Sequence, residues 1–271
     1  MGITFESPGI RRRTLLERVV FAAAAVALTA ASVWLHLAND TLTTKYDTQR
    51  AESKSVELPG IQLYLNTTTH IVAAHNRRAT SIELRQGEIA LEVHHDRARS
   101  VAVSVVGLFW VEDVGTKFAV KRYEDCATLS VTEGTAELRV EGMDYRTVYA
   151  GERIQGCLHK GHVEIRDVPV LLDKMQRDLA WEHGYLWFRG EPLREVVTDV
   201  NRYSVNPLYI EDPEIESIPI TFTLAIKHVG DFKAAIQPSN ISNNIDINEY
   251  TTGGSSVILL RAHRKHSGKT R

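Results

Sequence analysis

"SIELRQGEIALEVHHDRARSVAVSV", residues 81–105, carries the alternation that decides the fold of this chain. Apolar residues occupy every second position in "IALEV" (89–93) and again in "VAVSV" (101–105). This is the period of a β-strand with one buried face. The same pattern continues in "IQLYL" (61–65) and "TLSV" (128–131), and further strands are predicted at "TKFAVKRY" (116–123) and "AELRV" (136–140).

Glycines punctuate these segments and predict the turns between the strands. They stand at Gly60, Gly87, Gly115, Gly134, Gly142 and Gly151. Strands repeated every 8–12 residues or so are typical of a sandwich, a barrel or a β-solenoid. We therefore expect an all-β domain over residues 59–167, either a sandwich or a β-solenoid.

The period changes from Pro169 onward, which predicts a second, α+β part over residues 168–260. A linker helix is expected in "PVLLDKMQRDLAW" (169–181), because its apolar residues recur at helical spacing. A second helix is expected in "EPLREVVTDVNRYS" (191–204), with Pro192 in its first turn. Strands are predicted around these helices, at 185–188, 208–210, 218–224, 244–247 and 256–260, with a short helix at 231–236. The order is that of a small β-α-β-β-α-β unit.

The N-terminal region predicts a membrane anchor. Val19 to Leu37 contains no charged residue and is long enough for a helix to cross a bilayer. Four arginines precede it (Arg11, Arg12, Arg13 and Arg18), and the positive-inside rule then places residues 1–18 in the cytoplasm. A cleaved signal peptide, ending near Ala31, and a buried core helix remain as alternatives. With either an anchor or a cleaved signal peptide, the rest of the chain is exported, with 38–58 as a linker and 261–271 as a basic tail.

The remaining chemistry of the sequence argues for binding rather than catalysis. The net charge of −2 excludes a broad basic field for nucleic acid, and we expect no cofactor. Neither a nucleophile elbow nor a glycine-rich phosphate loop occurs, so an enzyme is not expected. The pairs His94-His95 and His159/His162 lack a full set of metal ligands, and we expect no metal site. The two cysteines, Cys126 and Cys157, either pair in a disulfide or are buried separately.

Several motifs in this order resemble the FecR family of single-span regulators of extracytoplasmic-function (ECF) sigma factors. They are "LPGIQLYLNTTTHI" (58–71), Gly87-Glu88, the turn Val114-Gly115-Thr116, Glu133-Gly134 and "VYAGERI" (148–154). For Gly115, Thr116 and Gly134 we favour a structural role in turns and strand starts. Where the family usually has Asp-Gly-Ser, this chain has Pro59-Gly60-Ile61.

The C-terminal part resembles the small secretin/TonB N-terminal type domain. The matching residues are Trp181, Gly184, Phe188, Leu193, Asn201, Arg202, Tyr203, Ser204 and Phe222, whereas the family often has glycine at Thr221. Typical members also carry a cytoplasmic domain of about 80 residues that binds the sigma factor. Only residues 1–18 precede the predicted membrane span here, so we expect that domain to be absent.

The resemblance implies an inner-membrane, periplasm-facing anti-sigma type regulator, of the kind that controls iron uptake. Its partners would be the signalling domain of a TonB-dependent outer-membrane receptor and an ECF sigma factor, reached directly or through another protein. Regulated cleavage of the exported part and then of the helix would carry the signal. For receptor contact we name edge-strand candidates and one cation: Leu208, Tyr209, Ile210, Ile220, Phe222 and Arg202.

One alternative function belongs to another class. An exported structural or scaffold module that binds a secretin-like assembly or a cell-wall component needs no cytoplasmic partner. A sigma-factor reading frame upstream would favour the regulator, and a secretion cluster would favour the scaffold.

Overall fold

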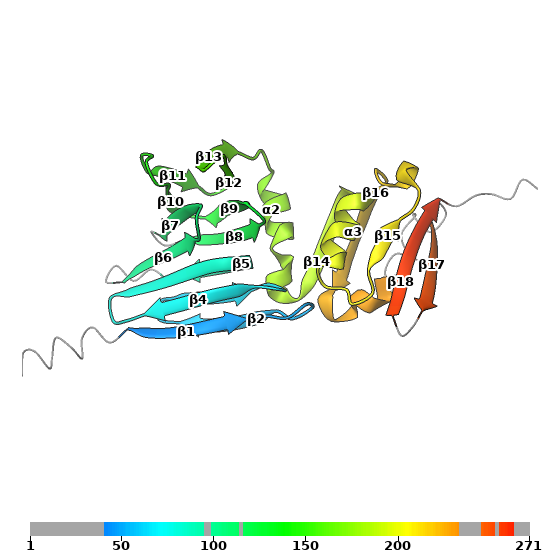
Figure 1. Cartoon of the computed structure of the whole chain (residues 1–271), viewed down its shortest axis with the longest axis horizontal. Coiled ribbons are helices and arrows are strands. Elements are labelled where there is room, and N and C mark those ends of the chain that lie inside the picture. Colours follow the sequence, from blue (N-terminus) through cyan, green and yellow to red (C-terminus); the bar gives the residue numbers. More distant parts are fainter. Residues whose placement is uncertain (1–40, 95–98, 114–115, 233–244, 253–254, 263–271) are drawn as a thin grey trace, which may run out of the picture. The chain divides into compact units, whose positions relative to one another are not determined.

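Strands dominate the part of the chain that the computed structural model describes, namely residues 41–94, 99–113, 116–232, 245–252 and 255–262. Between residues 41 and 167 all elements of the described ranges are strands, and we call this part the β domain (Figure 1). They are β1 (Leu42–Asp47), β2 (Lys54–Leu58), β3 (Ile61–Leu65), β4 (His70–His75), β5 (Ala79–Val93), β6 (Ser100–Val105), β7 (Phe109–Asp113), β8 (Lys117–Tyr123), β9 (Cys126–Glu133), β10 (Thr135–Arg139), β11 (Arg146–Tyr149), β12 (Arg153–His159) and β13 (His162–Asp167). The expected mainly β fold is confirmed.

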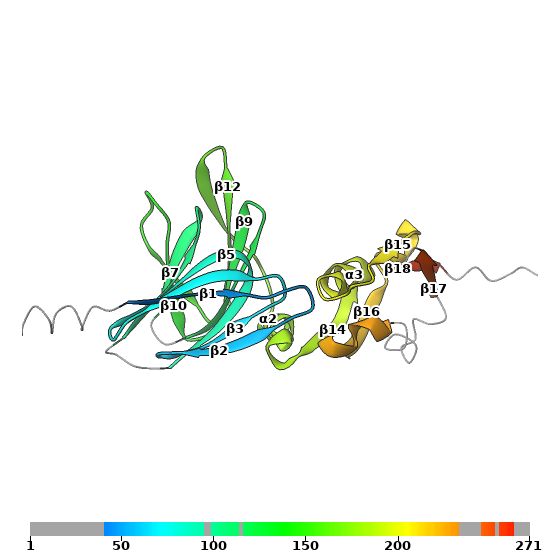
Figure 2. The same cartoon turned by 60° about the horizontal axis from the view of Figure 1, so that its bottom comes forward.

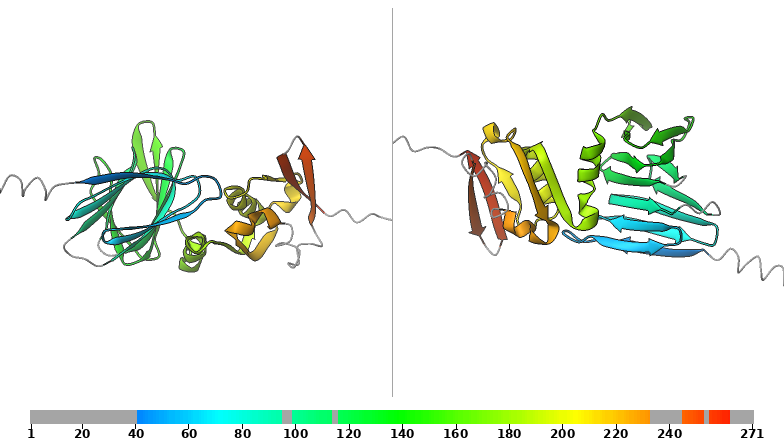
Figure 3. Two further views of the ribbon diagram at one scale, coloured as in Figure 1. Left: turned by 90° about the horizontal axis from the view of Figure 1, so that it is seen from below. Right: turned by 180° about the vertical axis from the view of Figure 1, so that it is seen from behind.

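One long strand organises the β domain. The first half of β5 pairs with β4 and, in parallel, with β6. From Gly87 onward β5 pairs instead with β3 and β8, both antiparallel. The sheet then runs on as β11-β10-β7-β6-β5-β8-β9-β12-β13 and curls around its own interior, as Figures 2 and 3 show. Of the sandwich and the β-solenoid left open by the sequence, neither describes this curled half-barrel.

Alternating side chains fill the interior of the curled sheet. Ile89 and Leu91 of β5 and Val101 and Val103 of β6 are almost completely buried, as the period of two predicts. Phe118 of β8 lies in the same apolar cluster and has no exposed surface. The β domain therefore has a hydrophobic core of its own.

The linker predicted over residues 38–58 is wrong in part, because β1 and β2 lie inside it. Each of these strands pairs with a single neighbour, β1 with β4 and β2 with β3. Their side chains are mostly exposed and charged or polar, so the sequence offers no apolar alternation there. Backbone pairing to buried strands, rather than a hydrophobic face, defines these two edges.

Helices and strands alternate after residue 171, and we call residues 172–262 the C-terminal segment. Its elements are α2 (Leu172–Asp178), the 3₁₀ turn η1 (Ala180–His183), β14 (Tyr185–Pro192), α3 (Leu193–Asn201), β15 (Leu208–Ile210), η2 (Pro213–Ile215), β16 (Pro219–Ala225), η3 (Ile226–Asp231), β17 (Ile245–Thr252) and β18 (Ser255–Ala262). β14 pairs with β16, and β18 pairs with β17 and, in parallel, with β15. Most of the short helix expected at 231–236 lies outside the described residues. The assignment to a secretin/TonB N-terminal type domain stays a prediction.

A second apolar cluster fills the C-terminal segment and reaches the β domain. It contains Trp181, Val196 and Phe232, together with Ala90 of β5 and Ala119 of β8. These two alanines point away from the interior of the curled sheet. The residues next to them on the same strands point inward, into the core of the β domain. Residues Thr43–Arg271 accordingly form one compact unit.

The predicted transmembrane helix at residues 19–37 lies outside the described residues. Within the described ranges, no helix has the length and apolar character that crossing a bilayer requires.

Candidate functional site

Three of the motifs quoted above meet where the C-terminal segment covers the outer face of β5, a contact that we call the junction. Asn66 and Thr67 belong to the turn between β3 and β4, and Glu88 follows the change of partners in β5. Arg202 and Tyr203 come directly after α3. These residues are separated by more than a hundred positions along the chain, and hydrogen bonds join them.

An ion pair forms the centre of the junction. Arg202 Nη2 lies 2.5 Å from Glu88 Oε2, and the same oxygen accepts a hydrogen bond of 3.0 Å from Asn66 Nδ2. The Glu88 side chain is 8% exposed and that of Arg202 is 24% exposed. Burial by itself raises the pKa of Glu88, but the charge of Arg202 and these hydrogen bonds outweigh it and leave that pKa below its usual value. Glu88 is therefore ionised at neutral pH.

Tyr203 adds a buried hydrogen bond beside the ion pair. Its hydroxyl donates to Asn66 Oδ1 at 2.7 Å, and the residue is 2% exposed. Burial raises the pKa of Tyr203, so the phenol stays protonated and can donate. Thr67 Oγ1 donates to the backbone oxygen of Arg202 at 3.2 Å. The turn after β3 thus holds both the side chains and the backbone that follow α3.

Gly87 allows the turn to lie so close to β5. Its φ of +89° is one that residues with a Cβ rarely adopt. A Cβ at this position would also lie 2.3 Å from Thr69 Oγ1 and 2.7 Å from the backbone oxygen of Thr68. Both the dihedral angle and the available space therefore require glycine next to Glu88.

Two further ion pairs connect the same parts of the molecule. Lys117 of β8 lies 3.1 Å from Glu182 of η1, whose side chain is 1% exposed. Arg153 of β12 lies 3.0 Å from Asp178 at the end of α2. Burial raises the pKa of Glu182 in spite of Lys117, and the charge of Glu182 in turn raises the pKa of Lys117 against its own burial. The junction is therefore held by charges on both sides of the central pair.

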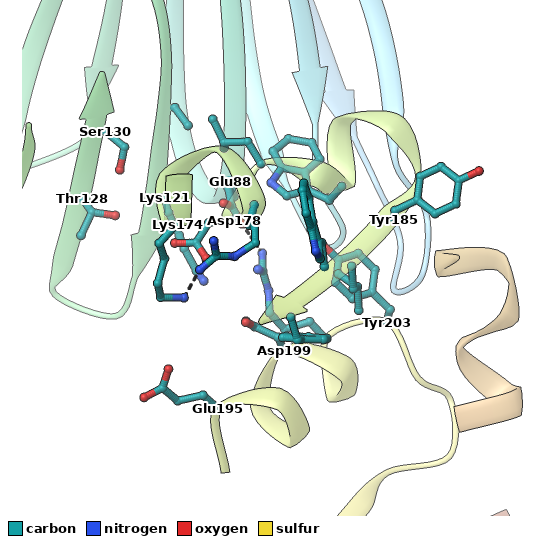
Figure 4. Close-up of a pocket in the computed structure, with 18 of the residues that line it drawn as sticks. Glu88, Lys121, Thr128, Ser130, Lys174, Asp178, Tyr185, Glu195, Asp199 and Tyr203 are labelled. Atoms are coloured by element: carbon teal, nitrogen blue, oxygen red, sulfur yellow. Dashed lines mark hydrogen bonds and ion pairs between the residues drawn. The ribbon is translucent and has the colours of Figure 1, made fainter. Parts of the chain in front are cut away.

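A cavity of about 250 Å³ lies at the junction, and Figure 4 shows its lining. In this view Glu88, Lys174 and Asp178 lie near the centre, with Thr128 on β9 to one side and Tyr185 to the other. A wider cavity of about 900 Å³ shares part of this lining. The residues that line both cavities are Lys121, Thr128, Arg153, Asp199 and Arg202.

The residues predicted for receptor contact have different surroundings. Leu208 and Ile220 are buried in the second core, and Phe222 packs against Phe188 and Phe232 with ring centroids 5.2 and 5.9 Å apart. Tyr209 is 53% exposed, and its neighbour Ile210 is half-buried. Arg202, the sixth of these residues, is paired within the chain. Their role in binding a partner stays a prediction.

Asn201 and Ser204 have local roles. The Asn201 side chain donates to the backbone oxygen of Leu208 at 2.9 Å and accepts from its backbone nitrogen at 2.8 Å. Ser204 Oγ accepts from the backbone nitrogen of Asn206 at 3.1 Å. The two side chains thereby fix the turn from α3 into β15.

The remaining predicted structural residues lie in the β domain. Gly134 has a φ of +74°, as the turn reading requires, and Thr116 is buried next to the start of β8. Gly115 lies outside the described residues. Cys126 and Cys157 face each other on β9 and β12 and form a disulfide, which is one of the two alternatives left open by the sequence.

The histidine pairs acquire no metal-binding partners within the described ranges. His94 is exposed and His95 lies outside those ranges, while His159 and His162 face each other on β12 and β13. No group of three or more His, Cys, Asp or Glu residues suited to a metal ion occurs among the described residues. The absence of a cofactor stays a prediction.

The sequence did not predict that Asn66 and Glu88 meet at the junction or that Lys121 lines its cavity. One signal was present, since Ala90 is a small residue between Glu88 and Glu92 on the outer face of β5. Small outward residues on a strand allow another element to approach closely. The sequence does not say which element this is.

These features define a class of protein, a curled β domain whose outer face is covered by a segment of helices and short strands. The family model described as FecR protein matches residues 44–137. The resemblance to the FecR family is therefore confirmed over these residues. Among proteins with curated descriptions, none is significantly similar in sequence.

Two crystal structures from Parabacteroides distasonis ATCC 8503 have a similar fold, and both are described as a "putative anti-sigma factor". The first is 22% identical, has a TM-score of 0.56, and the match covers 80% of this chain and 99% of that one. The second is also 22% identical, with a TM-score of 0.54 and coverage of 79% and 98%. At this identity the likeness concerns the fold alone. It extends well beyond residues 44–137, because 80% of this chain exceeds the FecR match.

Proposed function

We propose that this chain is an anti-sigma type regulator that binds partners and catalyses no reaction. The match to the FecR family model supports this function, because the resemblance to that family implies a regulator of sigma factors. The fold likeness to two structures described with an anti-sigma function agrees with it. In this proposal the chain is held in the inner membrane by residues 19–37, with its N-terminus in the cytoplasm and its described part in the periplasm.

The observation that carries the proposal is the polar junction between the β domain and the C-terminal segment. A receiver of an external signal needs a surface for its partner and a firm connection to the rest of the chain. The Glu88–Arg202 pair and the Tyr203–Asn66 hydrogen bond provide such a connection. A conformational change in the C-terminal segment would then also move the β domain, because a buried polar network has few alternative arrangements.

The partner surface is proposed on the outside of the C-terminal segment. Among the described residues β15 pairs with β18 alone and β16 with β14 alone, so each has a side to which another strand can add. Tyr209 of β15 is exposed next to this side. The proposed occupant is the signalling domain of a TonB-dependent receptor, and an ECF sigma factor is the target on the other side of the membrane.

The test measures binding and transcription together. The full-length chain is titrated with the signalling domain of the receptor encoded near it, and a sigma-dependent reporter is followed in cells. Tyr209→Ser should raise the Kd at least tenfold and abolish induction of the reporter. Tyr149→Ser is the matched control, because Tyr149 is 56% exposed on β11 of the β domain.

Two results would contradict the proposal. One is a reporter that responds identically with and without the gene for this chain. The other is equal weakening of receptor binding by both tyrosine substitutions, which would place the contact elsewhere. Binding to a secretin-like assembly without any effect on transcription would favour the scaffold alternative.

A further inference from the structure

Two residues that line the smaller cavity at the junction each carry a buried hydrogen-bond donor without an acceptor among the described residues. The donors are Nε of Arg177 in α2 and Nε1 of Trp181 in η1. Arg177 is 8% exposed and Trp181 is 2% exposed. The other two nitrogens of the Arg177 guanidinium are paired, with Asp173 at 2.6 Å and with Glu191 at 3.3 Å.

Buried donors without acceptors are rare in proteins, because each loses its hydrogen bonds to water and gains none in return. Two of them lining one cavity therefore indicate that an acceptor from outside the chain completes the site. Carboxylate and phosphate oxygens are the strongest acceptors for such N–H groups. The indole Nε1–H can only donate, so a cation or another donor does not fit there.

The charges around the cavity favour an anion. Of the carboxylates that line it, Asp178 is balanced by Arg153 and Lys174, each at 3.0 Å. Glu88 is balanced by Arg202. Lys121 forms no hydrogen bond or ion pair within the described part of the chain, although its charge acts on Glu88 and Asp199. An unpaired ammonium group is thus left at the wall of the cavity.

Asp199 is the carboxylate that would oppose an anion. Its side chain forms no hydrogen bond among the described residues, and burial raises its pKa, against the charges of Lys121 and Arg202. A raised pKa favours the neutral form, which reduces the repulsion. Glu195, also in the lining, is exposed and therefore well screened by solvent.

The lining of the wider cavity is also mainly positively charged. Besides the residues it shares with the smaller one, its lining includes three further cations, Arg50, Arg85 and Arg122, and one further carboxylate, Glu124. Clefts lined mainly by one sign of charge raise the local concentration of ions of the opposite sign. An anion would meet this basic cleft before it reaches the buried donors.

We propose that the cavity at the junction binds a small anionic molecule, whose carboxylate or phosphate oxygens accept hydrogen bonds from Trp181 Nε1 and Arg177 Nε while Lys121 neutralises its charge. The volume of about 250 Å³ restricts the buried part of this ligand to a small group. The site does not depend on the proposed regulatory function, since it rests on the donors and charges alone.

Binding at this place would also affect the junction. Thr128 and Ser130 of β9 line the cavity on the side of the β domain, and Arg177 and Trp181 line it on the side of the C-terminal segment. A ligand that touches both sides binds the assembled junction in preference to an opened one. It then stabilises the assembled form in proportion to its concentration.

The test observes the indole donors directly. The full-length chain is labelled with ¹⁵N-tryptophan, which gives one indole N–H signal for each of its four tryptophans. Inorganic phosphate and succinate are the probes, and each is titrated separately at constant ionic strength. Trp181→Phe assigns the Trp181 signal, and Trp110→Phe assigns that of Trp110, which is exposed on β7 and serves as the internal control.

We expect the Trp181 signal to shift in a saturable way with at least one probe, while that of Trp110 stays in place. Lys121→Gln should raise the Kd of this titration about tenfold or more, and it keeps the indole as a reporter. A shift with phosphate alone or succinate alone identifies which anion the site takes. Sodium chloride at equal ionic strength should produce no saturable shift.

Two outcomes would overturn the proposal. One is the absence of a saturable shift at Trp181 with either probe, which would mean that the buried donors are hydrated. The other is binding of equal strength in the Lys121→Gln variant and the wild type, which would mean that Lys121 does not face the anion. Because neither measurement involves a receptor or a sigma factor, failure here leaves the regulatory proposal standing, and the reverse also holds.

Discussion

The interior of the β domain and the junction are both buried, but different interactions hold them together. Inside the curled sheet, side chains such as Leu91 and Phe118 pack within a cluster of apolar groups. At the junction, Arg202 donates a charge-assisted hydrogen bond to Glu88, and the Tyr203 hydroxyl donates a neutral one to Asn66. Apolar packing depends on the amount of buried area and tolerates exchange of similar shapes. A buried polar contact depends on one arrangement, and removing a single partner leaves the other uncompensated.

This difference suggests a division of tasks between the two regions. The apolar core supplies stability that is independent of pH and of any partner. The junction adds less net free energy, since much of its attraction offsets the cost of desolvation, but it specifies how the two parts meet. Four predictions test this comparison, and they follow in order of decreasing effect.

Phe118→Ala should produce the largest loss, because it removes a ring without exposed surface from the core. A lowering of the unfolding free energy by about 3–5 kcal/mol is expected from lost transfer energy and the remaining cavity. Urea unfolding followed by circular dichroism measures it. Val106→Ala is the control, because Val106 is 43% exposed and its loss should stay within about 0.5 kcal/mol. A loss below about 1 kcal/mol for Phe118→Ala would mean that the core can collapse around the gap.

Arg202→Ala should cost about 2–3 kcal/mol, somewhat less than the 3–5 kcal/mol for a fully buried pair, because Arg202 keeps some contact with water. The loss arises from Glu88, which stays buried without its cation. In the double variant Glu88→Gln/Arg202→Ala the unpaired charge is gone, so its loss should fall short of the sum of the losses in Glu88→Gln and Arg202→Ala by at least about 1 kcal/mol. Additive losses in this double-mutant cycle would show that the two residues act separately.

Gly87→Ala tests the backbone part of the junction against Gly142→Ala. Both glycines have positive φ values, +89° and +77°, so both alanines cost about 1–2 kcal/mol of strain. A Cβ at Gly142 meets no atom within 4 Å, whereas at Gly87 it meets the backbone of Thr68 and Thr69. The unfolding free energy should therefore fall further for Gly87→Ala. Equal losses would show that the turn after β3 moves aside without cost.

Glu88 and Asp199 should show opposite dependence on pH. The pKa of Glu88 is lowered in the folded state, so its stabilisation is complete above the ordinary value near 4.5 and disappears as the pH falls through the lowered pKa. The pKa of Asp199 is raised, so its ionisation disfavours folding above its ordinary value. Asp199→Asn should therefore raise the unfolding free energy slightly at pH 7, and Glu88→Gln should lower it.

Unfolding of both variants between pH 3 and pH 8 measures this. Both differences from the wild type should vanish at the acidic end, where all carboxyls are protonated. The Asp199 effect is expected to be the smallest of the four, because Lys121 and Arg202 offset part of the cost of its burial. An Asp199→Asn variant that is less stable at pH 7 would show that the carboxylate makes a favourable contact.

Local patterns in the sequence predicted much of the fold. The alternation around Ile89 and Leu91 predicted strands with one buried face, and the structure places these residues in the core. The helical spacing of Leu193, Val196 and Val200 predicted α3 and its buried side. The edge strands β1 and β2 escaped prediction because their exposed side chains carry no period.

What the sequence determined by itself is therefore the identity of the elements and of the FecR motifs. Apolar residues recur along a strand or helix with that element's own period, so nearby residues are enough to reveal it. What only the tertiary structure decided is that Glu88 meets Arg202 across 114 positions and that Asn66 meets Tyr203 across 137. It also decided that Arg177 and Trp181 line one cavity with Lys121. Polar groups can pair with any complementary group that the fold brings near, so the residues around a polar group in the sequence do not reveal its partner.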